Sequence, residues 1–352
     1  MASLTNNPRV IQLAKDLGLD YWGDSLAAIE RHALSRVDEI VARSIVPVNS
    51  LDRLRDVLAE ALSVNVRELT TDECIDQIAD EFGHSYPRLR ERLRHEFRER
   101  GTEGLLLVNP VWDGSERLYL AIVDRRGQEA NRARFTAWHE LSHLLIAPAQ
   151  IPIEGLRRTN DVHLPKDPIE QVVDHIAGLV AFHQAFFGPA VDANTSGGPL
   201  RFEEVERVRI ATAADASLHS TAIACVNHSR VPTLLIKAEM AFKPSQLRTA
   251  AQHGFDLGIE AERPRLRAVQ CYKNAAVRTS KLRIQKNFRI PERSIIFEAA
   301  TRLGDCSLEA YEDQSWWETS SDGPLPRLAI FVRVAKRGGH LYAMISPRNL
   351  TA

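Results

Sequence analysis

The sequence contains a His-Glu-x-x-His motif formed by His139, Glu140 and His143. On a helix, residues four apart share a face, so both histidines can bind one metal ion. Zn²⁺ held by three protein groups lowers the pKa of water in its fourth position to roughly 7, which gives a nucleophile at neutral pH. Glu140 can take the proton of that water and pass it to a leaving amine. The motif therefore predicts peptide-bond hydrolysis, with Glu140 as the general base.

The residues around the motif predict the elements that position it. Leu141, Leu144 and Leu145 form an apolar stripe beside the histidines, as expected of a buried helix. Proline cannot continue the helical hydrogen-bond ladder, so Ala147-Pro148-Ala149 should end this helix. Upstream, residues 118–124 predict a strand, with a turn at 125–127. Zinc peptidases use this order of strand, turn and metal-binding helix.

Catalytic zinc needs a third protein ligand, and a second helix supplies two candidates. Asp167 followed by Pro168 predicts the start of this helix, which we expect to run to Gly188-Pro189. Glu170 and Asp174 lie four apart on one face of it, so either carboxylate could bind the metal. Glu170 is the first candidate and Asp174 the second.

Other roles are open for these side chains. Glu170 could instead bind the backbone of the cap in a capping box. The carboxylate that does not bind zinc could orient a histidine ligand. His163, His175 and His183 are further candidates for the third ligand, and His175, His183 or an arginine could stabilise the oxyanion.

Two strings of residues resemble the ImmA/IrrE-type metallopeptidases. They are Asp124-Arg125-Arg126-Gly127 and Arg134-Phe135-Thr136-x-x-His139-Glu140-Leu141-x-His143. That family carries Asp-Arg-x-Gly at a strand end, Arg-Phe-Thr-x-x-His-Glu-Leu-x-His on a helix, and a later helix whose first Glu is the third zinc ligand. Glu170 falls at that place. The resemblance therefore implies a helical, zincin-like domain with a small sheet, and Zn²⁺ bound by His139, His143 and Glu170.

The resemblance covers about residues 45–237. Within it, 202–229 resembles the helix-turn-helix-like segment that follows the active site in the family. The second helix departs from the family pattern Glu-x-x-Ala-x-x-Phe-Ala, because its sequence is Glu170-Gln-Val-Val-Asp-His-Ile-Ala177. Family members are cytoplasmic and typically cleave a helix-turn-helix repressor encoded beside them, which switches on a stress, mobile-element or phage-defence operon. The resemblance implies the same substrate class and location here.

Length and composition are typical of a globular protein. The chain of 352 residues can form two or three domains, with 44% hydrophobic and 26% charged residues. The net charge of −1 gives no overall attraction to nucleic acid or membrane. Residues 1–21 lack an uninterrupted apolar run, and no stretch approaches the ~20 apolar residues of a membrane helix. We therefore expect neither a signal peptide nor a membrane partner.

The four cysteines are widely spaced and form no Cys-x-x-Cys pair. In a cytosolic protein we expect reduced and at least partly buried thiols. One thiolate could instead occupy the fourth zinc position and keep the enzyme latent. The four are Cys74, Cys225, Cys271 and Cys306.

Periodicity predicts an α+β chain with four regions. They are a helical extension at 1–44, a zinc metallopeptidase domain at 45–190, a helix-turn-helix-like segment at 200–240 and a separate C-terminal α/β domain at 260–352. In the second region, we expect a helix over 51–66, a solvated helix face at 88–100 and a loop at 147–166, followed by a linker at 191–199.

The C-terminal region should contain short strands and a hairpin. The predicted strands are 283–286, 294–297, 308–311, 328–334 and 340–345, with Gly338-Gly339 as the hairpin turn. Some ImmA/IrrE-type proteins end in a GAF-like sensor domain, so the resemblance favours a sensor role for this region.

Basic residues cluster at the start of that region, with Tyr272 and Phe288 among them. A basic groove with aromatic stacking platforms is typical of single-stranded DNA binding, so we expect single-stranded DNA or a nucleotide as an effector. Alternatively, this is a basic surface balanced by acidic residues elsewhere. The basic residues are Arg263, Arg265, Arg267, Lys273, Arg278, Lys281, Arg283, Lys286, Arg289 and Arg293.

Two functions from different classes follow from these patterns. The first is a zinc endopeptidase that cleaves a partner repressor, with the C-terminal domain as signal input. The second is a non-catalytic DNA-binding regulator with a structural metal. Glu140 favours the enzyme, because a structural site has no use for a base next to its ligand. A DNA hydrolase fits less well, since the sequence lacks the carboxylate-rich constellation of two-metal nucleases.

Overall fold

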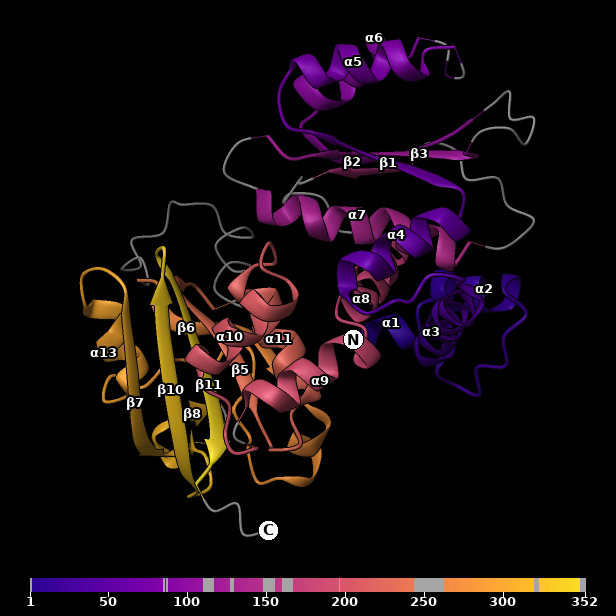
Figure 1. The fold of residues 1–352 in the computed structure, drawn as a ribbon. Coiled ribbons are helices and arrows are strands. Elements are labelled where there is room, and N and C mark those ends of the chain that lie inside the picture. Colours follow the sequence, from indigo (N-terminus) through magenta and orange to yellow (C-terminus); the bar gives the residue numbers. More distant parts are fainter. Residues whose placement is uncertain are drawn as a thin grey trace, which may run out of the picture. The chain divides into compact units, whose positions relative to one another are not determined.

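The computed structural model describes residues 2–84, 86, 88–109, 117–126, 130–147, 156–159, 167–195, 197–243, 263–319 and 323–348. Unit 1 comprises residues 1–187 and 212–217, and unit 2 comprises 188–211 and 218–352. Each unit combines a sheet with helices, so the α+β class is confirmed (Figure 1). The zincin-like and GAF-like assignments and the boundaries of the four regions remain predictions. None of the described helices has the length and hydropathy needed to cross a membrane.

Unit 1 is built on a four-stranded sheet in the order β1-β3-β2-β4. β1 (Val64–Leu69) is parallel to β3 (Tyr119–Asp124), whereas β2 (Thr102–Val108) is antiparallel to β3 and to β4 (Leu156–Thr159). One face packs on α5 (Glu73–Phe82) and α6 (Leu89–Arg94), and the other packs on α7 (Ala130–Leu145), the helix with the His-Glu-x-x-His motif (Figure 1). The sheet thus fixes one side of the motif helix.

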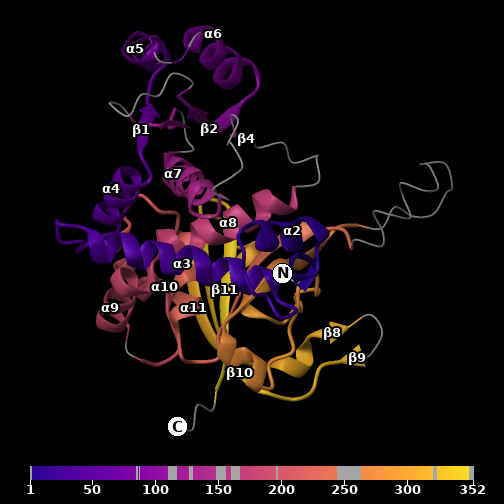
Figure 2. The same cartoon turned by 90° about the vertical axis from the view of Figure 1, so that its right-hand side faces the viewer.

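The remaining helices of unit 1 pack on α7, on α8 or on one another. The N-terminal 44 residues are helical as expected, and α3 packs against both α7 and α8 (Figure 2). Because α3 contacts α7 and α8, and α2 contacts α8, the N-terminal segment is part of the same unit as the motif. These remaining helices of unit 1 are α1 (Ala2–Thr5), α2 (Pro8–Asp16), α3 (Ser25–Arg43), α4 (Leu51–Ala61) and α8 (Pro168–Ala181).

Four sequence-based assignments in this part of the chain differ from the structure. The helix expected over 51–66 ends at Ala61, and after Ser63, whose φ is +57°, the chain continues as β1. The loop expected at 147–166 contains β4. The helix expected to reach Gly188-Pro189 ends at Ala181, where the backbone of Phe182 (φ −125°, ψ 45°) leaves the helical region. Pro189 instead lies inside α9 (Gln184–Asn194), which takes up the first part of the expected linker.

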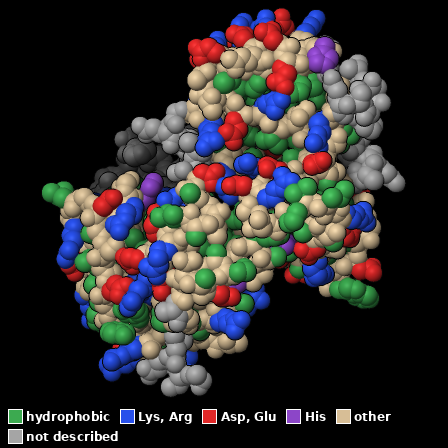
Figure 3. Space-filling model, in the orientation of Figure 1, with side chains coloured by type: hydrophobic (Ala, Val, Ile, Leu, Met, Phe, Trp, Pro, Cys, Tyr) green, Lys and Arg blue, Asp and Glu red, His purple; other side chains and the backbone are tan. Residues whose placement is uncertain are grey.

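The charge-dense run 88–100 forms α6 and the π-helix His95–Glu99. Its arginines pair with acidic residues of α5: Asp76 accepts a hydrogen bond from Arg94 at 2.8 Å and lies 3.2 Å from Nε of Arg90 in an ion pair. Figure 3 shows both signs of charge interspersed over this part of the surface. The run is therefore a solvated helix face, as expected.

Unit 2 contains a five-stranded antiparallel sheet in the order β6-β5-β11-β10-β7. Its core lies between one face of the sheet and α13, and α11 contacts β5 and β6. The elements are α10 (Phe202–Thr212), α11 (Leu218–His228), β5 (Leu234–Ala241), β6 (Arg265–Lys273), α13 (Ile295–Thr301), β7 (Cys306–Asp313), β8 (Glu318–Thr319), β9 (Gly323–Pro324), β10 (Ala329–Arg337) and β11 (His340–Pro347).

The strands expected at 308–311, 328–334 and 340–345 are confirmed as β7, β10 and β11. The strand expected at 294–297 is instead the start of α13, because the Ser294 side chain accepts from the backbone N–H of Ile296 at 3.2 Å and caps a helix. The expected strand at 283–286 is also wrong, because the backbone N–H of Arg283 donates to the side chain of Gln314 at 2.7 Å instead of joining a strand ladder.

Candidate metal centre

The helix α7 brings the two motif histidines onto one face. Their Nε2 atoms lie 3.1 Å apart and their ring centroids 4.8 Å apart. His139 is 1% exposed and His143 is 7% exposed. The i, i+4 spacing therefore produces a buried pair of imidazole nitrogens, as the sequence predicted.

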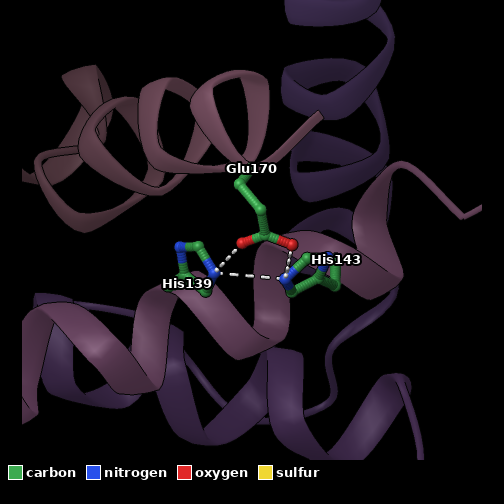
Figure 4. Close-up of side chains that lie close together, drawn as sticks. All are labelled: His139, His143 and Glu170. Atoms are coloured by element: carbon green, nitrogen blue, oxygen red, sulfur yellow. Dashed lines mark hydrogen bonds and ion pairs between the residues drawn. The ribbon is translucent and has the colours of Figure 1, made fainter. Parts of the chain in front are cut away.

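The helix α8 brings Glu170 to this pair (Figure 4). Its start is as expected, because Asp167 caps the helix by accepting from the backbone N–H of Ile169 at 2.9 Å. The Glu170 carboxylate then lies with Oε2 3.1 Å from His139 Nε2 and Oε1 3.6 Å from His143 Nε2. Glu170 thus faces the histidines from the first turn of α8.

The separations of these three groups fit a metal ion. One ligand atom from each of His139, His143 and Glu170 lies within 4.8 Å of the others. Donors on a tetrahedral Zn²⁺ with bonds of roughly 2.0–2.1 Å lie roughly 3.3 Å apart, close to the separations of 3.1 and 3.6 Å. Within the described ranges, this is the one group of His, Cys, Asp and Glu that could hold a metal. It contains no cysteine, although all four cysteines are described.

Asp174 lies behind the pair, one turn after Glu170. Its Oδ1 is 2.9 Å from Nδ1 of His139, the ring nitrogen that faces away from the group. An Nδ1–H that donates to this carboxylate leaves the lone pair of Nε2 free for a metal. Asp174 is therefore placed to orient His139, whereas Glu170 is the carboxylate that belongs to the three-residue group able to hold a metal.

Electrostatics at Glu170 favour its ionised form. Burial alone raises the pKa of Glu170, but the hydrogen bond with His139 and the charges of both histidines more than offset this, so its pKa lies below the ordinary value. An ionised carboxylate is the form that binds a cation.

The other histidine candidates are paired elsewhere. His175 Nε2 lies 3.1 Å from a carboxylate oxygen of Glu30, and His183 Nε2 lies 3.4 Å from Asp38, both on α3. Burial lowers the pKa of His183, partly offset by Asp38. His163 lies outside the described residues. The oxyanion-stabilising group remains a prediction.

The Glu140 side chain meets the sheet at β2. It is 1% exposed, and a Cβ built at Gly104 of β2 would lie 2.6 Å from its Oε1. Ala133 and Ala137, on the same side of α7, pack against Val123 of β3. The carboxylate is thus held between α7 and β2.

Three arginines that the sequence reasoning did not select support the two helices. Arg36 of α3 donates to the carbonyl oxygens of Leu144 at 3.0 Å and Leu145 at 2.7 Å, at the end of α7. Arg9 donates to Asp167 at 2.7 Å. Arg134, which is 7% exposed, donates to Asp52 of α4 at 3.1 Å and to Asp215. Of these three arginines, Arg134 alone belongs to a motif recognised in the sequence, the Arg-Phe-Thr string.

The predicted nucleic-acid residues lie in unit 2, just before the edge strand β6, on it and in the segment after it. Arg267 is half-buried and donates to backbone carbonyl oxygens of Ala241 and Asn287. The ring of Tyr272 contacts His219, and Phe288 packs against the core of the unit. The exposed members are Arg263, Arg265, Lys273, Arg278, Lys281, Arg283, Lys286, Arg289 and Arg293.

Fold and site define an α+β protein with a His-His-Glu group able to hold a metal ion. No protein-family model and no curated protein matches the chain. A solved structure, a Mycobacterium tuberculosis transcriptional regulator, is similar at 10% identity and a TM-score of 0.33, over 84% of this chain and 81% of that chain. Function is therefore argued from the site itself.

Proposed function

We propose that this protein is a zinc-dependent endopeptidase of the ImmA/IrrE type. One observation carries the proposal: Glu170 of α8 meets His139 and His143 of α7, with Asp174 behind His139. Two imidazoles and a carboxylate are a ligand set of catalytic zinc peptidases.

In this proposal each side chain has a defined role. His139, His143 and Glu170 would hold the zinc, which would act as a Lewis acid that lowers the pKa of water and polarises a peptide carbonyl. Glu140, which neighbours His139 on α7, accepts the proton of the attacking water and returns it to the leaving amine. Asp174 keeps His139 in the tautomer that binds metal.

The proposed substrate is a cytoplasmic helix-turn-helix repressor, whose cleavage switches on a stress or phage-defence operon. This rests on the resemblance of the two motif strings to the family. We propose that the activating signal acts on unit 2, where single-stranded DNA or a nucleotide would bind the exposed basic residues of β6 and the following segment.

The test is incubation of the purified protein with the repressor encoded beside it, with and without single-stranded DNA. Glu140→Gln is run in parallel, and Glu91→Gln on the exposed side of α6 serves as the matched control. We expect cleavage by the wild type and the control but not by Glu140→Gln, at about one zinc per chain in all three. If no protein cleaves although all hold zinc, the non-catalytic DNA-binding regulator replaces this proposal.

A further inference from the structure

The strand β2 approaches α7 at Gly104 more closely than a side chain permits. A Cβ at this position would lie 2.4 Å from Cγ2 of Thr136 and 2.6 Å from Oε1 of Glu140. Non-bonded carbon atoms pack at about 3.5–4.0 Å. The absence of a Cβ at Gly104 is therefore a condition for this packing.

The orientation of β2 explains why this glycine meets the helix. Leu105 and Leu107 belong to the core under α5 and α6, so alternation places Gly104 on the opposite face, toward α7. A β-bulge lies in the pairing with β4 between Thr102 and Gly104. Bulges re-aim side chains and are frequent beside active sites, and this one adjoins the contact with Glu140.

The helix side of the contact is equally close. Ala133 and Ala137 are 2% exposed and allow α7 to pack tightly on β3. Glu140 continues this stripe along the helix, three residues after Ala137, where it meets the backbone of β2. The catalytic carboxylate is therefore confined by main chain, which cannot rotate away as a side chain can.

We infer that Gly104 is a positioning residue for Glu140, an inference that rests on the proposed peptidase function. A methyl at Gly104 would push the carboxylate by roughly 1 Å to restore van der Waals contact. A displacement of that size at a catalytic group can cost about 100-fold in rate. The three atoms nearest to this methyl belong to Thr136 and Glu140 and to none of the proposed metal ligands, so zinc binding should persist.

The kinetic test separates Glu140 from the second crowded atom. Thr136→Ser removes the Cγ2 methyl group, so the single variant Thr136→Ser is compared with Thr136→Ser/Gly104→Ala. We expect both to bind about one zinc per chain, with similar KM for the repressor and a kcat about 100-fold lower in the double variant. A kcat in the double variant within about threefold of the single variant would overturn the inference.

A second readout uses metal-free protein and needs no substrate. In the Thr136→Ser background, the shift in melting temperature that Gly104→Ala causes is measured twice. One measurement uses protein that also carries Glu140→Gln, and the other uses protein that also carries Glu140→Ala. The glutamine keeps the crowding, whereas the alanine leaves room for the new methyl group. With Glu140→Gln, we expect Gly104→Ala to lower the melting temperature clearly, and with Glu140→Ala by less than half as much. Equal drops in melting temperature would refute the contact between position 104 and Glu140.

The outcomes distinguish the two ideas. A wild-type protein that holds zinc but cleaves nothing contradicts the peptidase proposal. An active wild type whose double variant keeps its kcat contradicts only the role of Gly104.

Discussion

Replacing Asp174 by asparagine tests whether the contact behind His139 controls metal binding. The carboxylate lies 2.9 Å from His139 Nδ1, and its side chain is 24% exposed, so solvent replaces little of the interaction. Loss of such an outer partner typically lowers metal affinity by about 10–100-fold, which equals about 1.4–2.7 kcal/mol. We expect that loss for Asp174→Asn, since the neutral amide accepts the Nδ1 proton more weakly than a carboxylate.

The assay is competition for zinc between metal-free protein and a chelating dye. His175→Gln is the matched control, because this residue is adjacent on α8 but pairs with Glu30 at 3.1 Å, away from the group. The control should bind zinc as the wild type does. Equal affinities for Asp174→Asn and the wild type would refute the assignment of Asp174 as an orienting residue.

Three further predictions concern stability. Arg36→Met should lower the free energy of unfolding by about 1–3 kcal/mol, because it removes two charge-assisted hydrogen bonds at the end of α7. The control Arg43→Met, at an exposed position, should lower it by almost nothing. Equal effects of the two substitutions would contradict the role of Arg36. Burial lowers the pKa of His219 to about 4 from 6.5, so the unfolded chain gains the proton first, and up to about 3 kcal/mol of stability present above pH 6.5 should be lost as pH falls toward 4. His219→Phe should flatten that slope in pH-dependent melts, and a slope as steep as that of the wild type would contradict the assignment to His219. Zinc at 100 times its Kd should add about 2.7 kcal/mol, so an unchanged melting temperature after chelation would count against a bound metal.

Features with a local signal could be predicted from the sequence. The i, i+4 histidines and the Asp167-Pro168 cap depend on nearby residues, and the structure places both as expected. Gly338 and Gly339 have φ values of +53° and +81°, the left-handed conformations that a two-residue hairpin turn requires, and they join β10 to β11.

Errors arose where local patterns were ambiguous. The short run at 294–297 is compatible with a strand or a helix, and its first residue, the capping Ser294, was the signal that decides. The helix that we expected to end at Pro189 ends earlier, because the backbone leaves the helical conformation at Phe182, which is not a helix-breaking residue.

Other features of the site depend on contacts distant in sequence. Arg36 reaches carbonyl groups 108 and 109 residues away, and no periodicity or motif marks it. Gly104 is likewise an ordinary glycine in a strand until the helix with Glu140 is placed against it. Such roles follow from tertiary packing alone.

The division into units has a consequence for how this chain can be shortened. The chain passes from one unit to the other three times, after residues 187, 211 and 217. The short return segment 212–217 carries Asp215, a partner of the buried Arg134 on the metal-binding helix. A chain ending near residue 190 would therefore lose that carboxylate and leave Asp52 as the remaining partner of Arg134 among the described residues. Unit 1 therefore cannot be released by a single proteolytic cut without losing part of itself.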